Sequence, residues 1–174
     1  MHELPSTINN DFIRYNSKKN NPSVISIFTA FFVYKGFRAI FLYRILRYSY
    51  VNNKKYLYYM TKMFDLLLNP IEISSRADIG PGFYIPHPQC IVIGGGKIGR
   101  NVSVFHGVTI GLKKELHEYP TIGDNVQIGA GSKILGKLAV GNNSRVAANA
   151  VVLNDVPDNS IAAGIPAKVI KENE

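Results

Sequence analysis

The sequence predicts a mainly β fold, a solenoid of short parallel strands built from six-residue repeats and preceded by a short α-helical region. Three observations support this prediction. Aliphatic residues recur every six positions from Ile73 onward, turn-forming residues follow them at a fixed spacing, and an aromatic, basic stretch without the repeat precedes them. We expect an N-terminal helical region over residues 1–70 and a solenoid over residues 71–174, with a protruding loop at about 111–121.

The six-residue period is carried by aliphatic anchors that we expect to face inward. They are Ile73, Ile79, Ile85, Ile91, Ile98, Val104, Ile110, Ile122, Ile128, Ile134, Val140, Val146 and Val152. Neither an α-helix nor a simple alternating strand has this period. Three such hexads close one triangular coil, in which the anchors stack on one another.

Residues that tolerate a positive φ follow most anchors by three positions and predict tight corners. They are Gly82, Gly94, Asn101, Gly107, Asn125, Gly131, Asn143, Asn149 and Asp155, with Lys137 as the exception. Two irregularities interrupt the period: a step of seven within IVIGGGKI, and a twelve-residue gap from Ile110 to Ile122. The polar gap predicts a loop, and such insertions commonly mark the binding face of a solenoid.

The stretch before the repeats is rich in Phe, Tyr, Leu and Ile, with Lys and Arg interspersed, and predicts helices at about 23–50 and 54–68. We expect its aromatic side chains to pack against the first coil, with contact to a membrane surface as the alternative. The longest apolar run, Val24 to Tyr34, is about half of what a membrane-spanning helix needs. No apolar segment of a secretory signal follows the N-terminal charges.

The net charge of +8 favours anionic partners. No helix-turn-helix, RNA-binding or zinc-finger pattern accompanies the charge, so nucleic acid is not expected. The single cysteine excludes an intramolecular disulfide framework and favours the cytosol. We therefore expect a cytoplasmic protein, with peripheral attachment at the inner face of the membrane as the alternative.

The motifs VQIGAG, SKILGK and LAVGNN, with a closing AAGIPAKVI, resemble the hexapeptide-repeat acyltransferase family. This resemblance implies a left-handed parallel β-helix and a homotrimer. Two longer segments, YKGFRAIFLYRILRYSY and IEISSRADIGPGFYIPHPQCIVIG, are similar to the serine O-acetyltransferase branch, which includes acetyltransferases of surface-polysaccharide gene clusters. The branch implies direct acetyl transfer from acetyl-CoA to a hydroxyl, with a histidine general base and no metal.

Two of the four histidines share a register in the repeats. His87 and His106 each follow an anchor by two positions, and those anchors are three hexads apart, so we expect the two rings on one corner in successive coils. Ala130 and Ala148 continue this column, and their small side chains leave room for a thin ligand. By resemblance, His87 matches the catalytic base, and the two alanines match the positions whose backbone binds the pantetheine arm of acetyl-CoA.

Other candidates rest on the resemblance or on position. Glu72 matches the family's acidic residue that orients the histidine, with a solvent-facing carboxylate as the alternative. Lys168 is a candidate for the phosphates at the nucleotide end of acetyl-CoA, with ordinary surface charge as the alternative. His106 is expected to line the acceptor side. Cys90 is expected to be a small buried side chain rather than a covalent acetyl carrier.

The candidate acceptor residues depart from the serine enzymes. Asn21 and Pro86 stand where those enzymes carry Asp, and Glu118-Tyr119 stands where they carry Arg-His, although a shifted gap places His117 at the His position. A site that binds an ammonium and a carboxylate loses affinity when the side chains of opposite charge are replaced. This predicts a saccharide hydroxyl as acceptor, in capsule, lipopolysaccharide or exopolysaccharide biosynthesis. The alternative is serine, acetylated to O-acetylserine for cysteine biosynthesis.

Two further alternatives stay open at this point: a zinc hydratase with histidine ligands between subunits, and a β-helix that serves only as a scaffold. The chain ends soon after PAKVI, without the Ile-terminated tail by which serine acetyltransferases engage cysteine synthase, so that complex is not expected. Most of the helical domain that pairs trimers into hexamers is also missing, which favours a simple trimer.

Overall fold

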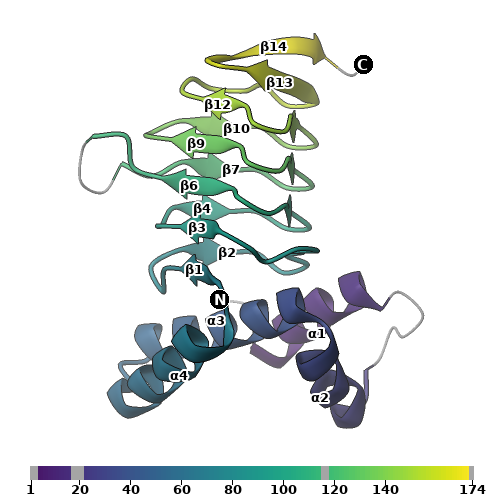
Figure 1. The fold of residues 1–174 in the computed structure, drawn as a ribbon, viewed down its shortest axis with the longest axis vertical. Coiled ribbons are helices and arrows are strands. Elements are labelled where there is room, and N and C mark those ends of the chain that lie inside the picture. The colour runs from purple at the N-terminus through teal and green to yellow at the C-terminus, as the bar shows by residue number, and fades with distance from the viewer. Residues whose placement is uncertain (1–3, 17–21, 115–117, 173–174) are drawn as a thin grey trace.

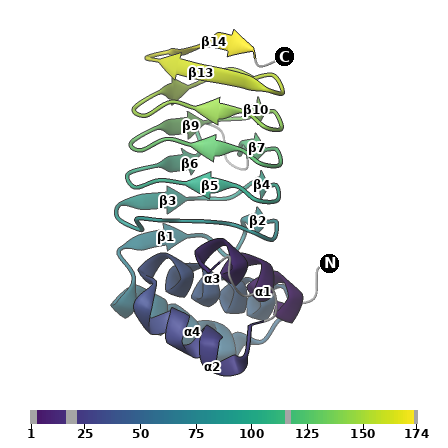
Figure 2. The same cartoon turned by 90° about the vertical axis from the view of Figure 1, so that its right-hand side faces the viewer.

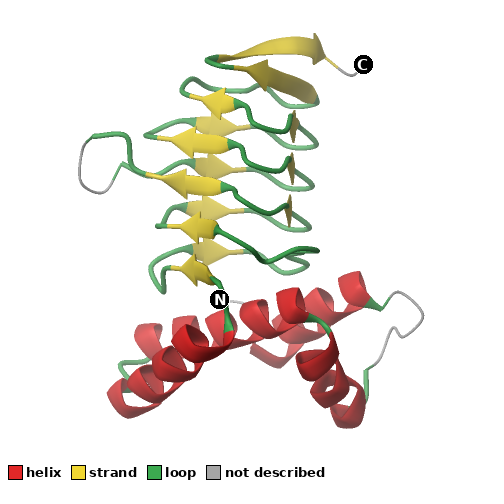
Figure 3. Ribbon diagram, viewed as in Figure 1, coloured by secondary structure: helices red, strands yellow, loops and turns green. Residues whose placement is uncertain are grey.

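The computed structural model describes residues 4–16, 22–114 and 118–172 of the chain. Four helices form a base, and a tall stack of short strands rises from it (Figures 1 and 3). The helices are α1 (Leu4–Tyr15), α2 (Val24–Val33), α3 (Lys35–Val51) and α4 (Lys55–Leu68). The strands are β1 (Ile71–Ile73), β2 (Asp78–Ile79), β3 (Ile91–Ile93), β4 (Lys97–Ile98), β5 (Ser103–Val104), β6 (Thr109–Gly111), β7 (Thr121–Ile122), β8 (Gln127–Ile128), β9 (Lys133–Leu135), β10 (Ala139–Val140), β11 (Arg145–Val146), β12 (Val151–Val152), β13 (Ser160–Gly164) and β14 (Ala167–Glu172).

The strands form three sheets, and each sheet is one face of the coil (Figure 2). The first has the order β1-β3-β6-β9-β12, the second β10-β7-β4-β2, and the third β14-β13-β11-β8-β5. Every pairing is parallel except that of β13 with β14, which closes the far end of the stack. The predicted β-solenoid with an N-terminal helical region is confirmed at this level.

The core is the stack of predicted anchors. All of them are buried, with exposed fractions of 5% or less, and they align between coils, as in the pairing of Ile98 with Ile122. Burial of one such side chain contributes about 1.5–3 kcal/mol. The second inward position, two residues before each anchor, takes residues from alanine and serine to Leu138 and Phe83. Where it is serine, its hydroxyl is hydrogen-bonded: that of Ser132 donates to the carbonyl of Gly129 at 2.8 Å.

The corner between the second and third sheets is held by stacked asparagines with positive φ. Asn101, Asn125 and Asn143 have φ of 56°, 58° and 56°. The amide of Asn101 donates to the side-chain oxygen of Asn125 at 3.3 Å, and that of Asn125 to Asn143 at 3.1 Å. The left-handed backbone that the sequence predicted for these corners is therefore confirmed.

Three predicted corner positions are wrong. In the seven-residue step the positive φ falls at Gly96 rather than Gly94, because the extra residue moves the turn. At the corner after Ile134 the positive φ falls at Gly136, so Lys137 does not adopt a left-handed conformation. Asp155 does not adopt a positive φ; its carboxylate accepts a hydrogen bond from the backbone N–H of Ala139 at 2.8 Å and so supports the turn from its side chain.

The helical base also differs from the prediction. The expected helix at 23–50 is two helices, because the chain is extended at Tyr34 (φ −102°, ψ 101°) and turns by 115° between α2 and α3. Residue 34 is a tyrosine and not a proline or glycine, so the apolar pattern continues through the break and the sequence does not indicate it. Helix α1 was not expected, because its sequence LPSTINNDFIRY has few apolar residues.

Among the described helices, none alone is long and apolar enough to cross a membrane. Helices α2 and α3 meet the length and composition criteria only as a bent pair.

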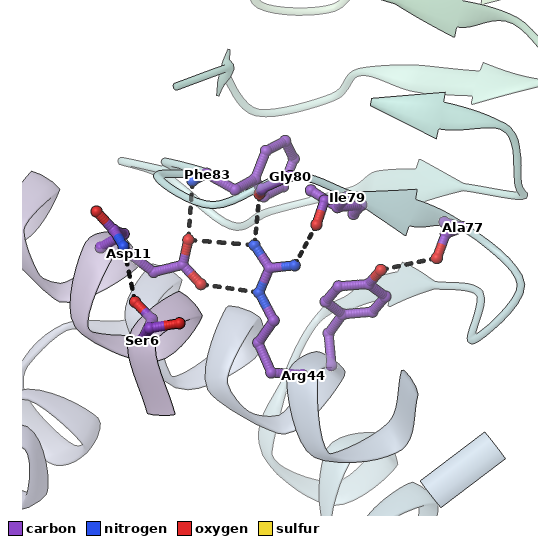
Figure 4. A network of polar contacts seen from close by, with 9 residues as sticks. Ser6, Asp11, Arg44, Ala77, Ile79, Gly80 and Phe83 are labelled. Carbon is purple, nitrogen blue, oxygen red and sulfur yellow. Dashed lines mark hydrogen bonds and ion pairs between the residues drawn. The ribbon is translucent and has the colours of Figure 1, made fainter. Parts of the chain in front are cut away.

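A buried polar network joins the helices to the first coil (Figure 4). Arg44 on α3 forms an ion pair with Asp11 on α1 at 2.8 Å, and both side chains are at most 5% exposed. The guanidinium of Arg44 also donates to the carbonyls of Ile79 and Gly80. Asp11 in turn accepts from the backbone N–H of Phe83 at 2.9 Å. These backbone groups belong to the first coil, so side chains supply the partners that a preceding coil would otherwise provide.

We predict that Asp11→Ala lowers the free energy of unfolding by about 3–5 kcal/mol, because it leaves the buried guanidinium of Arg44 without its counter-charge. Urea unfolding followed by circular dichroism measures the change. The exposed Arg76→Ala is the control and is expected to stay within about 0.5 kcal/mol of the wild type. Equal stability of the two variants would show that the ion pair does not hold the junction.

Candidate active site

His87 and His106 lie on one corner of the solenoid in consecutive coils. Their ring centroids are 6.2 Å apart and the ring planes meet at 70°. The coils are joined here by the backbone N–H of Gly107, which donates to the carbonyl of Gln89 at 2.8 Å. Both histidines are exposed. The stacking expected from their register is confirmed, and it places two titratable groups side by side at the surface.

Small residues continue the same corner away from the helices. The backbone N–H of Gly131 donates to the carbonyl of His106, and that of Asn149 to the carbonyl of Ala130, each at 2.8 Å. Ala130 is half-buried and Ala148, in the next coil, is exposed. An edge lined by methyl groups leaves room for a narrow, extended molecule that ends at the histidines.

Glu72 lies on the outward face of β1, where it is exposed and pairs in register with Val92 of β3. Its segment runs beside the histidine corner, because the backbone N–H of Cys90 donates to the carbonyl of Pro70 at 3.2 Å. No hydrogen bond joins Glu72 to His87, both of which the structure describes. The carboxylate is thus close to the corner in the fold without contacting the imidazole.

The remaining predicted site residues are dispersed. Lys168 is exposed on β14 and pairs with Ala163, at the end of the solenoid opposite the helices. Asn21 and His117 lie outside the described residues. Cys90 is not buried as expected: it is exposed and has a φ of 54°, because the chain turns through a left-handed corner at this residue.

A pocket of about 380 Å³ opens beside His87, where the α2–α3 junction meets the first coil. Its lining includes Tyr34 and Lys35 from the junction, and Tyr84 and Gln89 from the coil. The pocket therefore combines a potential base, a cationic side chain and neutral polar groups within one cavity. Of the residues that line the pocket, the sequence prediction had considered His87 and Pro86.

The wall of this pocket is fixed by a close approach of α3 to the coil. A Cβ atom at Gly36 would lie 1.8 Å from the carbonyl oxygen of Ile85, so only glycine fits. Beside it, the hydroxyl of Tyr15 donates to the carbonyl of Ile85 at 3.0 Å and accepts from its N–H at 2.9 Å. Burial raises the pKa of Tyr15 above its ordinary value, which keeps the phenol protonated for both bonds. In the sequence, the glycine of the YKGF motif is the residue that could have indicated this close contact.

The protruding loop leaves the solenoid at a different corner, between β6 and β7 (Figure 1). Where the chain returns, the ring of Tyr119 covers the triple glycine: a Cβ at Gly95 would come within 3.0 Å of its ring carbons. Glu118 lies 4.0 Å from the ammonium of Lys137. Tyr119 and Glu118 thus lie across the first sheet from the histidine corner of the same chain.

Within the described ranges, no group of three His, Cys, Asp or Glu side chains is arranged to hold a metal ion. The corner itself presents the imidazoles of His87 and His106 beside an open edge of small residues.

Comparison with known proteins places this arrangement among transferases. The family model "Bacterial transferase hexapeptide (six repeats)" matches residues 119–154. The chain is 38% identical over 156 residues to a serine acetyltransferase of Bacillus subtilis. The aligned region covers 88% of this chain and 72% of that protein. It superimposes on the Neisseria gonorrhoeae serine acetyltransferase solved in complex with serine, with a TM-score of 0.83, 31% identity, and coverage of 97% and 69%.

A serine acetyltransferase solved in complex with CoA gives a TM-score of 0.80 at 32% identity, covering 96% of this chain and 69% of that one. Fold and site together define an acyltransferase built on a β-solenoid. The chain belongs to the hexapeptide-repeat acyltransferase family. The predicted enzyme class, an O-acetyltransferase with acetyl-CoA as donor, is confirmed.

The predicted saccharide acceptor and the role in polysaccharide biosynthesis are wrong. The relatives that match over most of the chain are serine acetyltransferases. The prediction rested on three aligned positions, Asn21, Pro86 and Glu118, at which this chain lacks the charged side chain of the serine enzymes. Of these, Pro86 lines the pocket, whereas Glu118 lies at another corner of its own chain. The prediction did not consider Lys35, a cationic residue that also lines the pocket.

We predict that Gly36→Ala destabilises the protein by roughly 1–3 kcal/mol, because the new methyl group overlaps the carbonyl of Ile85. This is opposite in sign to the gain of roughly 0.5–1 kcal/mol that Gly→Ala usually gives in a helix. Gly111→Ala is the matched control, since a Cβ there meets nothing within 4 Å. Thermal unfolding of both variants measures the difference, and a Gly36→Ala protein as stable as the control would contradict the packing of this wall.

Proposed function

We propose that this protein is a serine O-acetyltransferase, which transfers the acetyl group of acetyl-CoA to the hydroxyl of L-serine. The observation that carries the proposal is the position of His87, which stands where the 380 Å³ pocket meets the open alanine-lined edge. Serine in the pocket and a thioester on the edge would meet at this imidazole. The 30–38% identity to serine acetyltransferases supports the choice of acceptor.

In the proposed reaction, neutral His87 takes the proton of the serine hydroxyl as its oxygen attacks the thioester carbonyl carbon. The tetrahedral intermediate collapses, the carbon–sulfur bond breaks, and the imidazolium returns the proton to the departing thiolate. The products are O-acetylserine and CoA, so protons and electron pairs balance without any further reactant. A rotation of the Glu72 side chain would let its carboxylate accept from the second ring nitrogen and stabilise the imidazolium.

The proposed donor site is the small-residue column of the same corner. The pantetheine arm lies beside Ala130 and Ala148, and the nucleotide end extends toward Lys168 on the closing hairpin. His106, one coil above His87, lines the acceptor side. Asn21 and His117 stay candidates for the acceptor site on the basis of the resemblance.

The proposal includes the finer features of the family, a left-handed coil and a homotrimer. The position of the loop supports assembly, because in one chain the loop and the histidine corner lie on different edges of the solenoid. A rotationally related copy would bring the loop of one subunit to the histidine corner of the next.

We predict that the wild type acetylates L-serine with kcat/KM of about 10⁴ M⁻¹s⁻¹ or more, and that His87→Ala lowers kcat by roughly two to four orders of magnitude. Free-thiol release with product mass measures both. His106→Gln is the neighbouring control and is expected to keep measurable turnover. Near-native activity of His87→Ala would exclude the base, and a wild type that binds acetyl-CoA but leaves serine unmodified would exclude the acceptor.

We predict that Ala148→Leu raises the dissociation constant of acetyl-CoA by about tenfold or more, because the larger side chain fills the edge on which the arm lies. The melting temperature should change little, since Ala148 is exposed. Ala139→Leu makes the same substitution at an exposed position on another face, and it should leave binding unaltered. Isothermal titration calorimetry compares the two, and equal affinities would place the donor on a different edge.

A further inference from the structure

The pocket beside His87 has a strongly one-sided charge. Among the described residues that line it, Lys35 is the only one with a permanent charge, and no carboxylate is among them. The Lys35 side chain is exposed, and no Asp or Glu oxygen of the described chain lies within 4.0 Å of its ammonium. Lys35, one of the residues that line the pocket, is therefore a cation without a counter-ion within the described chain.

The backbone of Lys35 is held firmly against the catalytic corner. Its neighbour Gly36 is buried and is in closest approach to Ile85, which is two residues before His87. Helix α3 begins at Lys35, and Tyr34 before it provides no side-chain hydrogen bond to the helix end. The positive end of the helix dipole thus lies at the same wall and adds to the field of the ammonium.

The other position that was a candidate for this charge, residue 118, does not line the pocket of its own chain. Glu118 stands at the aligned position of the family's arginine, but it lies at the loop corner and faces Lys137 at 4.0 Å. Within one chain it therefore neither supplies a cation to the pocket nor forms an ion pair with Lys35. An anionic group of the acceptor would meet Lys35 as its principal partner among the described residues.

We propose that Lys35 is the specificity-determining residue of the acceptor site and that it binds the carboxylate of the hydroxy acid whose hydroxyl is directed at His87. This inference rests on the proposed function and names the part of serine that the pocket recognises. The described lining offers an ammonium only neutral groups, among them Tyr34, Tyr84 and Gln89. The site therefore selects a short hydroxy-carboxylate and depends less on the amino group.

The test compares three acceptors that differ by one charged group: L-serine, 3-hydroxypropionate, which lacks the ammonium, and ethanolamine, which lacks the carboxylate. For Lys35→Met we expect KM for L-serine to rise by about 10- to 100-fold with kcat little changed, the effect of removing a hydrogen bond to a charged group. Activity with ethanolamine should be poor in the wild type and unchanged in the variant. Lys35→Arg, which keeps the charge, should restore most of the affinity.

Lys55→Met on α4 is the control, since it removes another exposed lysine, one that does not line the pocket, and it should behave as the wild type. Calorimetric titration with 3-hydroxypropionate gives a second readout that does not need turnover, and its binding should be lost in Lys35→Met. An unchanged KM for serine in Lys35→Met, or an equal loss with ethanolamine, would overturn the role of Lys35 while serine acetylation stands. A wild type that neither acetylates serine nor binds 3-hydroxypropionate would overturn both.

Discussion

The stacking of one aliphatic side chain in every six is the constraint on which the rest of the structure depends. Because each anchor must lie on its equivalent in the next coil, residues at matching positions of successive hexads form straight columns along the edges. Distant residues such as His87 and His106 become neighbours by this rule alone. The loop leaves the coil after the first sheet, between β6 and β7, whereas the histidines precede strands of that sheet. The first sheet therefore separates the loop from the histidine corner.

A stack of parallel strands leaves the backbone of its first coil without partners, and the helical base meets this need. Tyr43 donates to the carbonyl of Ala77, Arg44 to those of Ile79 and Gly80, and Asp11 accepts from Phe83. Buried carbonyl and N–H groups are costly when unpaired, which explains why charged side chains are found in a junction that aliphatic residues would otherwise fill. The positions of α1 and α3 follow from these contacts, and the pocket beside His87 lies where they meet the first coil.

Features that depend on local period were predictable from the sequence, and features that depend on contacts between distant segments were not. The anchors, most corners and the histidine column follow from spacing. Helix α1 was not predicted because it has few apolar residues. It contributes to the fold through long-range polar contacts, those of Asp11 and those of Tyr15, whose bonds reach Ile85, 70 positions away. The break at Tyr34 is equally unmarked in the sequence, because no helix breaker occupies it and the close approach of Gly36 to the first coil is a tertiary contact.

The error about the acceptor has the same origin. Comparing aligned positions treats a binding site as a list of residues, whereas the affinity for an ion depends on the sum of charges around the place where it binds. Glu118 substitutes for an arginine in the alignment, yet it lies at another edge and pairs with Lys137. Lys35 belongs to the YKGF segment that carries the resemblance, but its charge was not considered for the acceptor, and it lines the pocket beside His87. On the proposal made above, the anion is therefore bound from the end of a helix rather than from the loop.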